Sequence, residues 1–408
     1  MLSNIKSIVN EDVSNKVVIL RADLNIPLVN GVVQDQTRLK RLMPTINYLL
    51  ENQSKLVICS HLGRPKGKFD ENFSLKPLVN VLSEITKAKV HFNSSCIGKE
   101  VLKQKNALKQ GEILLLENLR FHESEIKNDN NFANELSKGC DFFVNDAFSC
   151  SHRAHASLHA ITKFLPSFSG LLLDEEVKAL TSVLNSPIKP VAALVGGAKI
   201  SSKINIIEYL LTKMDYLVIG GAMANTFLIA QGLNMGKSLY EKDCIDIAKS
   251  ILKTSELNNC QIILPIDLVV SEKFETNANF EIVSSNAVPS EMMALDIGPK
   301  TISKISSVFQ NINTLLWNGP VGAFETPPFG EGTFKLAKEA AKLTVNDNLI
   351  TVAGGGDTMS ALNKACVVND FTYVSSAGGA FLEWLEGMEL PAISVLSNNL
   401  NYKFRKEK

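Results

Sequence analysis

The chain has 408 residues, of which 45% are hydrophobic and 21% are charged, so we expect a globular protein with more than one domain. Its 42 basic residues balance its 42 acidic residues, which argues against a protein that binds nucleic acid through a strongly basic surface. No apolar run approaches the roughly 20 residues that a membrane-spanning helix needs.

Short apolar runs recur along the chain, and each is followed by a loop and a segment of helical periodicity. The runs are 16–20, 55–59, 89–92, 113–116 and 141–145 in the first half, and 191–195, 216–219, 262–265, 314–317, 349–353 and 371–375 in the second. Runs of four or five apolar residues without alternation indicate strands that are buried on both faces. We therefore expect an α/β fold with two doubly wound, Rossmann-like parallel sheets.

Three of the helical segments carry boundary signals. Segments 37–52 and 74–87 each have a Thr or Ser near the start, which suits a helix N-cap. Segment 171–185 is followed by Pro187 and Pro190, which end a helix. We expect an N-terminal domain over 1–178, a connector helix and hinge over 171–188, and a C-terminal domain over 189–392.

The cysteines and the N-terminus indicate the compartment. Seven cysteines, an odd number, include no CxxC pair, and Cys59 and Cys260 lie in or beside apolar runs. This usage is typical of reduced thiols in a cytoplasmic protein. The first 16 residues lack the basic and then apolar pattern of a signal peptide.

Arginine follows the predicted strands of the first half. Ligands of open α/β sheets bind at the carboxyl ends of the strands. The segments at these ends are 21–25, 60–65, 117–120 and 145–155, and they carry Arg21, Arg64, Arg120 and Arg153. Arg38 opens the helix after the first loop, and six of the seven arginines precede residue 154. Together these side chains predict a pocket for a small polyanion.

Glycine takes the corresponding place in the second half. The segments after its strands are 196–203, 220–225, 318–325, 354–358 and 376–380. Glycine allows close backbone approach, so N–H groups at helix starts can bind phosphates. Lys199 and Lys203 add positive charge, and Asp357 follows three glycines in a position suited to a Mg²⁺ ligand. Because this half has no His, it cannot use histidine as an acid or base.

The sequence offers little support for a dehydrogenase or for a zinc site. A two-domain dehydrogenase would need a GxGxxG fingerprint and a catalytic His or Lys near it, and neither is seen. His152, His155 and His159 have the spacing of one helix face, but suitable further ligands for zinc are not evident nearby. Substrate contact or polar packing is the favoured role for these histidines.

The motifs at the strand ends closely resemble those of the phosphoglycerate kinase family over essentially the full length of the chain. The matching segments are 21–27, 37–38, 60–67, 114–121, 146–157, 196–203, 317–325, 353–358 and 378–387. The resemblance implies a phosphotransferase with a carboxyl group as acceptor. Such an enzyme moves the acyl phosphate of 1,3-bisphosphoglycerate to Mg-ADP, giving 3-phosphoglycerate and ATP, in the cytoplasm and as a monomer. It also implies that 393–408 returns to the N-terminal domain.

The resemblance also implies roles for individual residues. Arg38 and Lys199 would be catalytic, on the two sides of the transferring phosphoryl group. The glycerate and its phosphate would be held by Arg21, Asp23, Asn25, Arg38, His61, Leu62, Gly63, Arg64, Arg120 and Arg153. The nucleotide would be held by Lys199, Lys203, Gly220, Gly221, Gly298, Asn318, Glu325, Gly355, Gly356, Asp357 and Thr358, with Asp357 as the Mg²⁺ ligand. A non-catalytic relative should have lost Arg38, Lys199 or Asp357, and all three are present.

The chain departs from the family pattern in three places. The usual Gly-Thr-Ala after Asp-Ala-Phe is Ser149-Cys150-Ser151, the stretch of Thr and three Gly begins Ser376-Ala377, and a common Ser is Phe381. Since no charged residue is lost, we expect altered turnover at most. Ala377 should restrict the backbone where a helix start faces the transferring phosphate.

Overall fold

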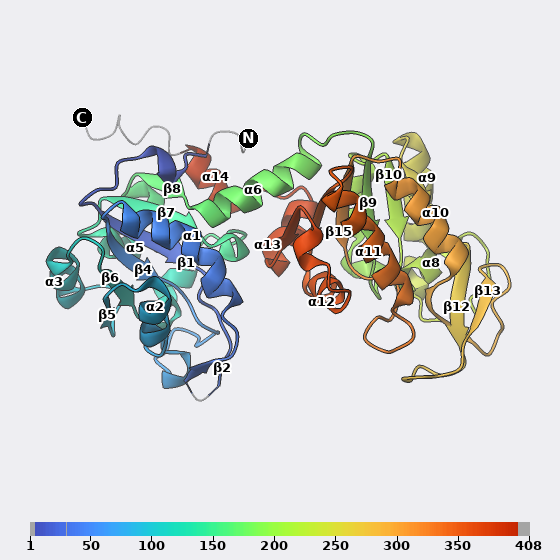
Figure 1. The fold of residues 1–408 in the computed structure, drawn as a ribbon, viewed down its shortest axis with the longest axis horizontal. Coiled ribbons are helices and arrows are strands. Elements are labelled where there is room, and N and C mark those ends of the chain that lie inside the picture. The colour runs from blue at the N-terminus through green and yellow to red at the C-terminus, as the bar shows by residue number, and fades with distance from the viewer. Residues whose placement is uncertain (1–4, 30, 399–408) are drawn as a thin grey trace. The chain divides into compact units, whose positions relative to one another are not determined.

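The computed structural model describes residues 5–29 and 31–398, which form two compact units (Figure 1). Unit 1 comprises the described part of residues 1–177 and 389–408, and unit 2 comprises residues 178–388. Helix α6 (Leu171–Leu184) begins in unit 1 and ends in unit 2. Residues 399–408 of the segment expected to return to the first domain lie outside the described residues.

Unit 1 is built on a six-stranded sheet whose neighbouring strands all run parallel, in the order β5-β6-β4-β1-β7-β8. These strands are β1 (Val17–Ala22), β4 (Lys55–Cys59), β5 (Val90–Asn93), β6 (Ile113–Leu116), β7 (Phe142–Asp146) and β8 (Ser167–Ser169), with a separate hairpin of β2 (Leu28–Val29) and β3 (Val32–Val33). The helices are α1 (Thr37–Glu51), α2 (Leu78–Thr86), α3 (Lys99–Ala107), α4 (Glu123–Ile126), α5 (Asn130–Ser137) and α14 (Pro391–Asn398). Four of the five predicted strands are buried along almost all of their length, as unbroken apolar runs require.

Both expected N-caps in this unit are wrong. Helix α1 is preceded by Gln36, and Thr37 lies inside the helix and donates its hydroxyl to Asp35. Helix α2 begins later than expected, after Pro77, because the Ser74 hydroxyl donates instead to the buried carboxylate of Glu117 at 2.7 Å. A Pro at the start of a helix loses no intrahelical hydrogen bond.

Unit 2 repeats the parallel plan with the order β11-β10-β9-β15-β16-β17. Its strands are β9 (Val191–Val195), β10 (Tyr216–Ile219), β11 (Gln261–Ile263), β15 (Thr314–Asn318), β16 (Ile350–Gly354) and β17 (Tyr373–Ser375). An antiparallel sheet adds β12 (Asp267–Ser271), β13 (Glu281–Ser284) and β14 (Met293–Ile297). The helices are α7 (Ile204–Leu211), α8 (Ala222–Ala230), α9 (Ile245–Leu257), α10 (Pro299–Phe309), α11 (Glu331–Val345), α12 (Gly356–Lys364) and α13 (Gly378–Leu385).

The strand orders locate one switch point in each sheet. From β1 the chain moves to β4 on one side, and it later places β7 and β8 on the other side. Likewise β9 leads to β10, whereas β15 and β16 lie on the opposite side. Crevices that bind ligands form where the winding direction reverses, here between β1 and β7 and between β9 and β15.

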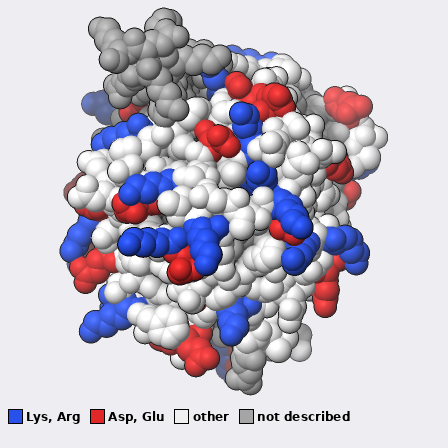
Figure 2. Space-filling view, turned by 90° about the vertical axis from the view of Figure 1, so that its left-hand side faces the viewer, with Lys and Arg blue, Asp and Glu red and all other residues white. Residues whose placement is uncertain are grey.

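The surface charge reflects the equal numbers of basic and acidic residues, and the helices reflect the lack of long apolar runs in the sequence. On the face shown in Figure 2, basic and acidic side chains are interspersed, and neither kind forms one continuous area. Within the described residues, no helix combines the length and the apolar character needed to cross a membrane.

Candidate active site

Arg21 and His61 form the buried centre of the pocket in unit 1. Arg21, near the end of β1, is fully buried and donates from Nε to Ser157 Oγ at 3.0 Å and from Nη1 to the Ala22 carbonyl at 2.5 Å. Its Nη2 lies 3.2 Å from His61 Nδ1. Because a guanidinium can only donate, Nδ1 accepts and the imidazole carries its proton on Nε2. Burial, with the charges of Arg21 and Arg120, holds the pKa of His61 well below its usual value.

The buried carboxylate of Glu125 is linked to Arg21 through Ser157. Glu125 in α4 is 0% exposed and accepts hydrogen bonds from the Ser157 hydroxyl at 2.6 Å and the Ser157 N–H at 2.9 Å. Ser157 thereby links the carboxylate to the guanidinium. Sequence reasoning missed both residues, although a buried arginine always needs buried acceptors.

Asp23 connects three segments beside this centre. Its Oδ2 accepts from Arg38 Nη1 at 2.6 Å and from Ser149 Oγ at 2.5 Å, and its Oδ1 accepts from the Asn25 N–H at 3.1 Å. The segments are the loop after β1, the first turn of α1 and the loop after β7. The predicted residues Asp23, Asn25 and Arg38 thus lie together at the switch point.

The loop after β4 is fixed by two of the predicted residues. Asn25 Oδ1 accepts from the Gly63 N–H at 2.9 Å, and Arg120 Nη1 donates to the Gly63 carbonyl at 2.7 Å. Gly63 has φ +59°, and a Cβ there would lie 2.3 Å from the ring of Phe73, so only glycine fits. The next residue back, Leu62, is buried, and its carbonyl accepts from Asn118.

The remaining arginines keep donors for a ligand. Arg120 is 8% exposed, and its Nε is buried without a hydrogen-bond partner in the described structure. Arg64 is exposed and makes no hydrogen bond or ion pair with any described residue. Arg153 is half-buried and donates from Nε to His152 Nε2 at 3.0 Å. These three predicted arginines therefore bring unused N–H groups to one unit.

His152, His155 and His159 do not have the arrangement on one helix face that their spacing suggested for a zinc site. Residues 151–159 form turns rather than a helix, so the three side chains do not share a face. Besides the contact of His152 with Arg153, His155 Nδ1 lies 3.8 Å from Glu125 and His159 Nδ1 lies 3.1 Å from Asn128 Nδ2. Polar packing, the favoured alternative, describes these contacts.

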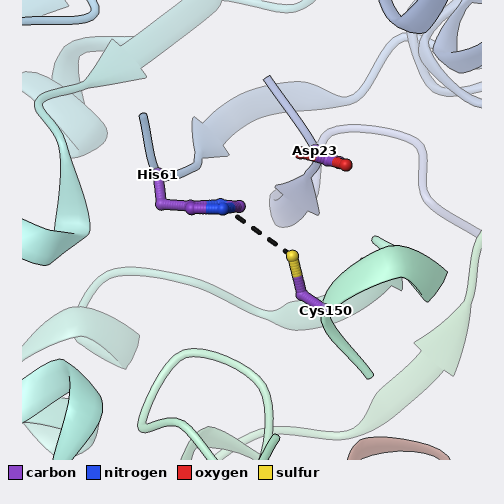
Figure 3. A group of neighbouring side chains, drawn as sticks. All are labelled: Asp23, His61 and Cys150. Carbon is purple, nitrogen blue, oxygen red and sulfur yellow. Dashed lines mark hydrogen bonds between the residues drawn. The ribbon is translucent and has the colours of Figure 1, made fainter. Parts of the chain in front are cut away.

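Asp23, His61 and Cys150 place three potential metal ligands within 4.8 Å of one another (Figure 3). The His61 ring is directed at Cys150 Sγ, 3.9 Å from Nδ1. However, His61 Nδ1 already faces Arg21, and Asp23 Oδ2 already pairs with Arg38. Burial also raises the pKa of the Cys150 thiol, which disfavours the thiolate that a metal needs. The guanidinium groups therefore make this cluster a poor cation site.

Unit 2 contains a cavity of about 360 Å³ at its own switch point. Glycines 197 and 221, Glu325 and Asp357 line it, and much of the remaining wall is apolar, including Leu239, Pro265, Met293, Leu295 and Phe324. Apolar walls with a few polar groups are typical of sites for flat organic rings. Of the residues predicted to hold the nucleotide, Gly221, Glu325 and Asp357 line this cavity and the others do not. Gly298 lies before α10, packed against Asp267.

Lys203 is fixed beside Asp357 and the end of β15. Its Nζ donates to Asn318 Oδ1, while Asn318 Nδ2 donates to the Gly354 carbonyl at 2.8 Å. Burial lowers the pKa of Lys203 to about 8, and the charge of Asp357 partly offsets this effect. Asn318 is only 3% exposed, so its side chain positions Lys203 instead of facing the solvent.

The loops of unit 2 touch one another through their glycines. A Cβ on Gly196 would lie 1.9 Å from the Pro320 carbonyl oxygen, and one on Gly221 would lie 2.5 Å from that of Gly197. Gly220 packs in the same way against Val321. Close loop packing therefore explains several glycines that the sequence assigned to phosphate binding.

The first turn of α12 carries the other predicted phosphate contacts. Gly355 has φ +102° before the helix, and a Cβ on Gly356 would meet nothing within 4 Å. Thr358 is buried and uses its hydroxyl internally, donating to the Gly354 carbonyl and accepting from the Gly319 N–H. Lys199 is exposed in the loop before η7 (Ile200–Ser202). The open space at Gly356 is where an anion could reach the helix start.

Two departures from the family pattern are accommodated by the fold. Ala377 has φ −90° and ψ 106°, an ordinary conformation for any residue, so alanine fits this backbone without strain. Phe381 is fully buried and lies against Gly354, where an added Cβ would approach its ring to 2.7 Å. The phenyl ring thus fills space that a serine would leave open.

A small polyanion and a nucleotide need different surfaces, one rich in side-chain donors and one lined by backbone and apolar groups. The two units supply one of each at equivalent places in equivalent sheets. The fold and the sites together define the class of two-domain α/β phosphotransferases.

The sequence and the fold of this chain match those of known proteins from one family. The family model of phosphoglycerate kinase matches residues 8–388. Phosphoglycerate kinase of Methylorubrum extorquens (strain PA1) is 50% identical over 93% of this chain and 95% of its own, and that of Rhodopseudomonas palustris is 49% identical over 97% and 99%. The structure of phosphoglycerate kinase from Coxiella burnetii superposes with a TM-score of 0.90 at 38% identity, covering 97% of this chain and 99% of that one. The chain belongs to the phosphoglycerate kinase family.

Proposed function

We propose that the chain carries out the reaction of its family with one substrate on each unit. Unit 1 would bind 3-phosphoglycerate or 1,3-bisphosphoglycerate, and unit 2 would bind ADP or ATP with Mg²⁺. The reaction is the reversible transfer of the acyl phosphate of 1,3-bisphosphoglycerate to ADP.

The observation that carries this assignment is the cluster of Arg21, His61 and Arg120 at the switch point of unit 1. Arg21 is fully buried, and three of its five N–H groups are used by the protein, which leaves two donors. Arg120 has a buried Nε that finds no hydrogen-bond partner in the described part of the chain, and His61 carries a proton on Nε2. Buried donors of this kind are costly unless a ligand accepts from them, and a phosphorylated acid has enough anionic oxygens to do so.

Catalysis then consists of positioning and charge neutralisation. The attacking atom is a phosphate oxygen of ADP, or a carboxylate oxygen in the reverse direction, and both are already anionic, so no general base is needed. This agrees with His61, whose acceptor nitrogen is occupied by Arg21. Arg38 and Lys199 would stabilise the transferring phosphoryl group from the acid and nucleotide sides.

Asp357 fits the role of Mg²⁺ ligand. Its carboxylate is exposed at the cavity, in the first turn of α12, and it makes no hydrogen bond or ion pair with any described residue. A free carboxylate is a ligand that Mg²⁺ prefers, and the ion when bound would neutralise charge on the nucleotide phosphates. Lys203, which precedes α7 and is held by Asn318 at the end of β15, would contact the same phosphates.

In-line transfer requires donor and acceptor oxygens to meet, so we propose that the two units close when both substrates are bound. Helix α6 continues from one unit into the other and is the candidate hinge. Small-angle scattering should show a smaller radius of gyration with both substrates than with either alone. An unchanged radius would rule out closure.

All seven cysteines are unpaired, which supports a reducing compartment, and we propose a cytoplasmic, monomeric enzyme. Sedimentation velocity of the purified chain would show a single species of monomer mass; a stable dimer would contradict this.

The direct test is a coupled assay with ATP, Mg²⁺ and 3-phosphoglycerate that follows ADP release. The expected result is turnover that needs all three components and falls sharply in Arg21→Ala. Arg41→Lys is the matched control, because Arg41 pairs with Glu176, 3.8 Å away, and lies outside the proposed site. The assignment fails if the wild-type chain is inactive or if Arg21→Ala keeps full activity.

A further inference from the structure

We propose that Ser149 is a positioning residue for Arg38, acting through the carboxylate of Asp23. The inference rests on the proposed function, in which Arg38 stabilises the transferring phosphoryl group. Ser149 is not among the residues that the family resemblance implies for the substrate site, and its hydroxyl reaches Asp23 from the short 3-10 helix after β7.

The geometry joins the three residues through a single oxygen. Asp23 Oδ2 accepts from Ser149 Oγ at 2.5 Å and from Arg38 Nη1 at 2.6 Å, while Oδ1 accepts from the Asn25 N–H at 3.1 Å. A carboxylate has about four lone-pair sites, so these donors do not exclude one another. Together they hold both oxygens of Asp23 from different segments of unit 1.

The position of the Arg38 guanidinium is fixed by its hydrogen bond to Asp23. Its side chain is 34% exposed, and within the described residues the bond to Asp23 is its only hydrogen bond. The Asp23 side chain is 12% exposed, so water has little access to it. Rotation about the bond to the Asp carboxylate is soft. Without Ser149, only the Asn25 N–H and Arg38 itself would fix that rotation, and the guanidinium would move with the carboxylate.

The consequence is specific to the reaction step. A less well placed Arg38 would still attract the substrate, because its charge remains in the pocket. It would contact the transferring phosphoryl group less well, since a misplacement of about 1 Å can be costly in rate. Loss of the Ser149 hydroxyl should therefore lower kcat and leave KM for 3-phosphoglycerate almost unchanged.

The experiment compares Ser149→Ala and Ser149→Gly with the wild-type enzyme, by kcat and by single-turnover rate. We expect both variants to lose about three- to ten-fold in rate, which corresponds to the net contribution of one typical hydrogen bond, with KM within about two-fold. Ser151→Ala is the matched control. It removes a fully buried hydroxyl from the same loop that donates to the Ala147 carbonyl and does not touch Asp23.

A double-mutant cycle then separates positioning from a general weakening of the loop. In an Arg38→Lys background, where the fork is already lost, Ser149→Ala should cost less than about two-fold in kcat. The same factor in both backgrounds, a change in KM alone, or an unchanged rate would each overturn the inference. These outcomes differ from failure of the proposed function, in which the wild-type chain itself shows no turnover.

Discussion

Arg21 donates from Nη2 to Nδ1 of His61 across 3.2 Å, and this contact fixes the imidazole as a neutral donor through Nε2. Burial lowers the pKa of His61 well below its usual value, and the charge of Arg21 lowers it further, since a second proton would face the guanidinium. His61 therefore works as a hydrogen-bond donor and not as an acid or base.

Substitution at His61 should reveal which nitrogen matters. The amide nitrogen of Gln can occupy the place of Nε2, whereas the amide oxygen of Asn can occupy that of Nδ1. We expect KM for 3-phosphoglycerate to rise about ten-fold or more in His61→Asn and clearly less in His61→Gln, because one lost donor costs about 1.4 kcal/mol or more. Steady-state kinetics at pH 7 provide the measurement; the reverse order would show that the acceptor role of Nδ1 dominates.

Arg38→Lys should lower kcat by much more than it raises KM. Lysine keeps the charge but loses the planar fork that matches a phosphoryl group. Removal of one such transition-state donor typically costs about 10²- to 10³-fold in kcat. Arg41→Lys, three residues further along α1, should leave both constants unchanged. If kcat of Arg38→Lys were normal, Arg38 would only bind the substrate.

Nucleotide affinity should weaken in mildly alkaline solution. Burial lowers the pKa of Lys203 to about 8, so the free enzyme loses this positive charge as the pH rises through that value. We expect KM for Mg-ATP to rise by about five-fold between pH 7 and pH 9.

Lys203→Arg provides the check on this pH dependence. Arginine stays protonated throughout the range, so KM for Mg-ATP should become nearly independent of pH. The same slope in the variant and in the wild-type enzyme would assign the effect to another group.

Asp357→Asn should separate the two substrate sites. Loss of a direct metal ligand should cost at least on the order of 100-fold in kcat/KM for Mg-ATP, because even outer-shell partners can cost about that much. Calorimetry should show weaker Mg²⁺-dependent ADP binding and unchanged 3-phosphoglycerate binding. A loss of both affinities would point to unfolding and against a role restricted to the ion.

Asp146 should make stability fall with rising pH. Burial raises its pKa from 3.8 to about 7, so the folded state holds a proton that the unfolded state releases. The stability gained from that proton is fully present below about pH 4 and is lost as the pH rises through 7.

Asp146→Asn is the matching variant, because Oδ2 has no hydrogen-bond partner among the described residues and Oδ1 accepts from the Leu173 N–H at 2.9 Å. An amide keeps that acceptor and carries no charge. The free energy of unfolding of the variant, relative to that of the wild-type chain, should rise by up to about 1.4 kcal/mol per pH unit between pH 4 and pH 7. Denaturant unfolding at pH 5 and pH 8 measures this; a constant difference would contradict it.

The sequence was sufficient to predict the central strands of both sheets. Strands buried on both faces, such as β1 and β6, must be continuous apolar runs, and this pattern is visible without any structure. Strand β8 was missed because its three residues, Ser-Phe-Ser, carry no apolar run. The antiparallel sheet was missed because β13 is largely exposed, so burial imposes no apolar pattern on it.

The site was predicted where chemistry follows directly from strand ends, and missed where it depends on distant partners. Arg21 lies near the end of its strand, and Asp23 and Arg120 follow theirs, so position along the sequence pointed to all three. Glu125 and Ser157 are separated from each other by 32 residues, and only the folded chain brings them to Arg21. The inward orientation of Asn318 toward Lys203 also depends on tertiary contacts.

The buried contact between Phe381 and Gly354 makes two positions of this chain interdependent. A side chain at 354 would collide with the phenyl ring, since even a Cβ would lie 2.7 Å from it. Removing the ring would open a void behind the strand that leads into Gly355 and Gly356. A larger residue at 354 therefore needs a smaller one at 381, so the two positions must change together.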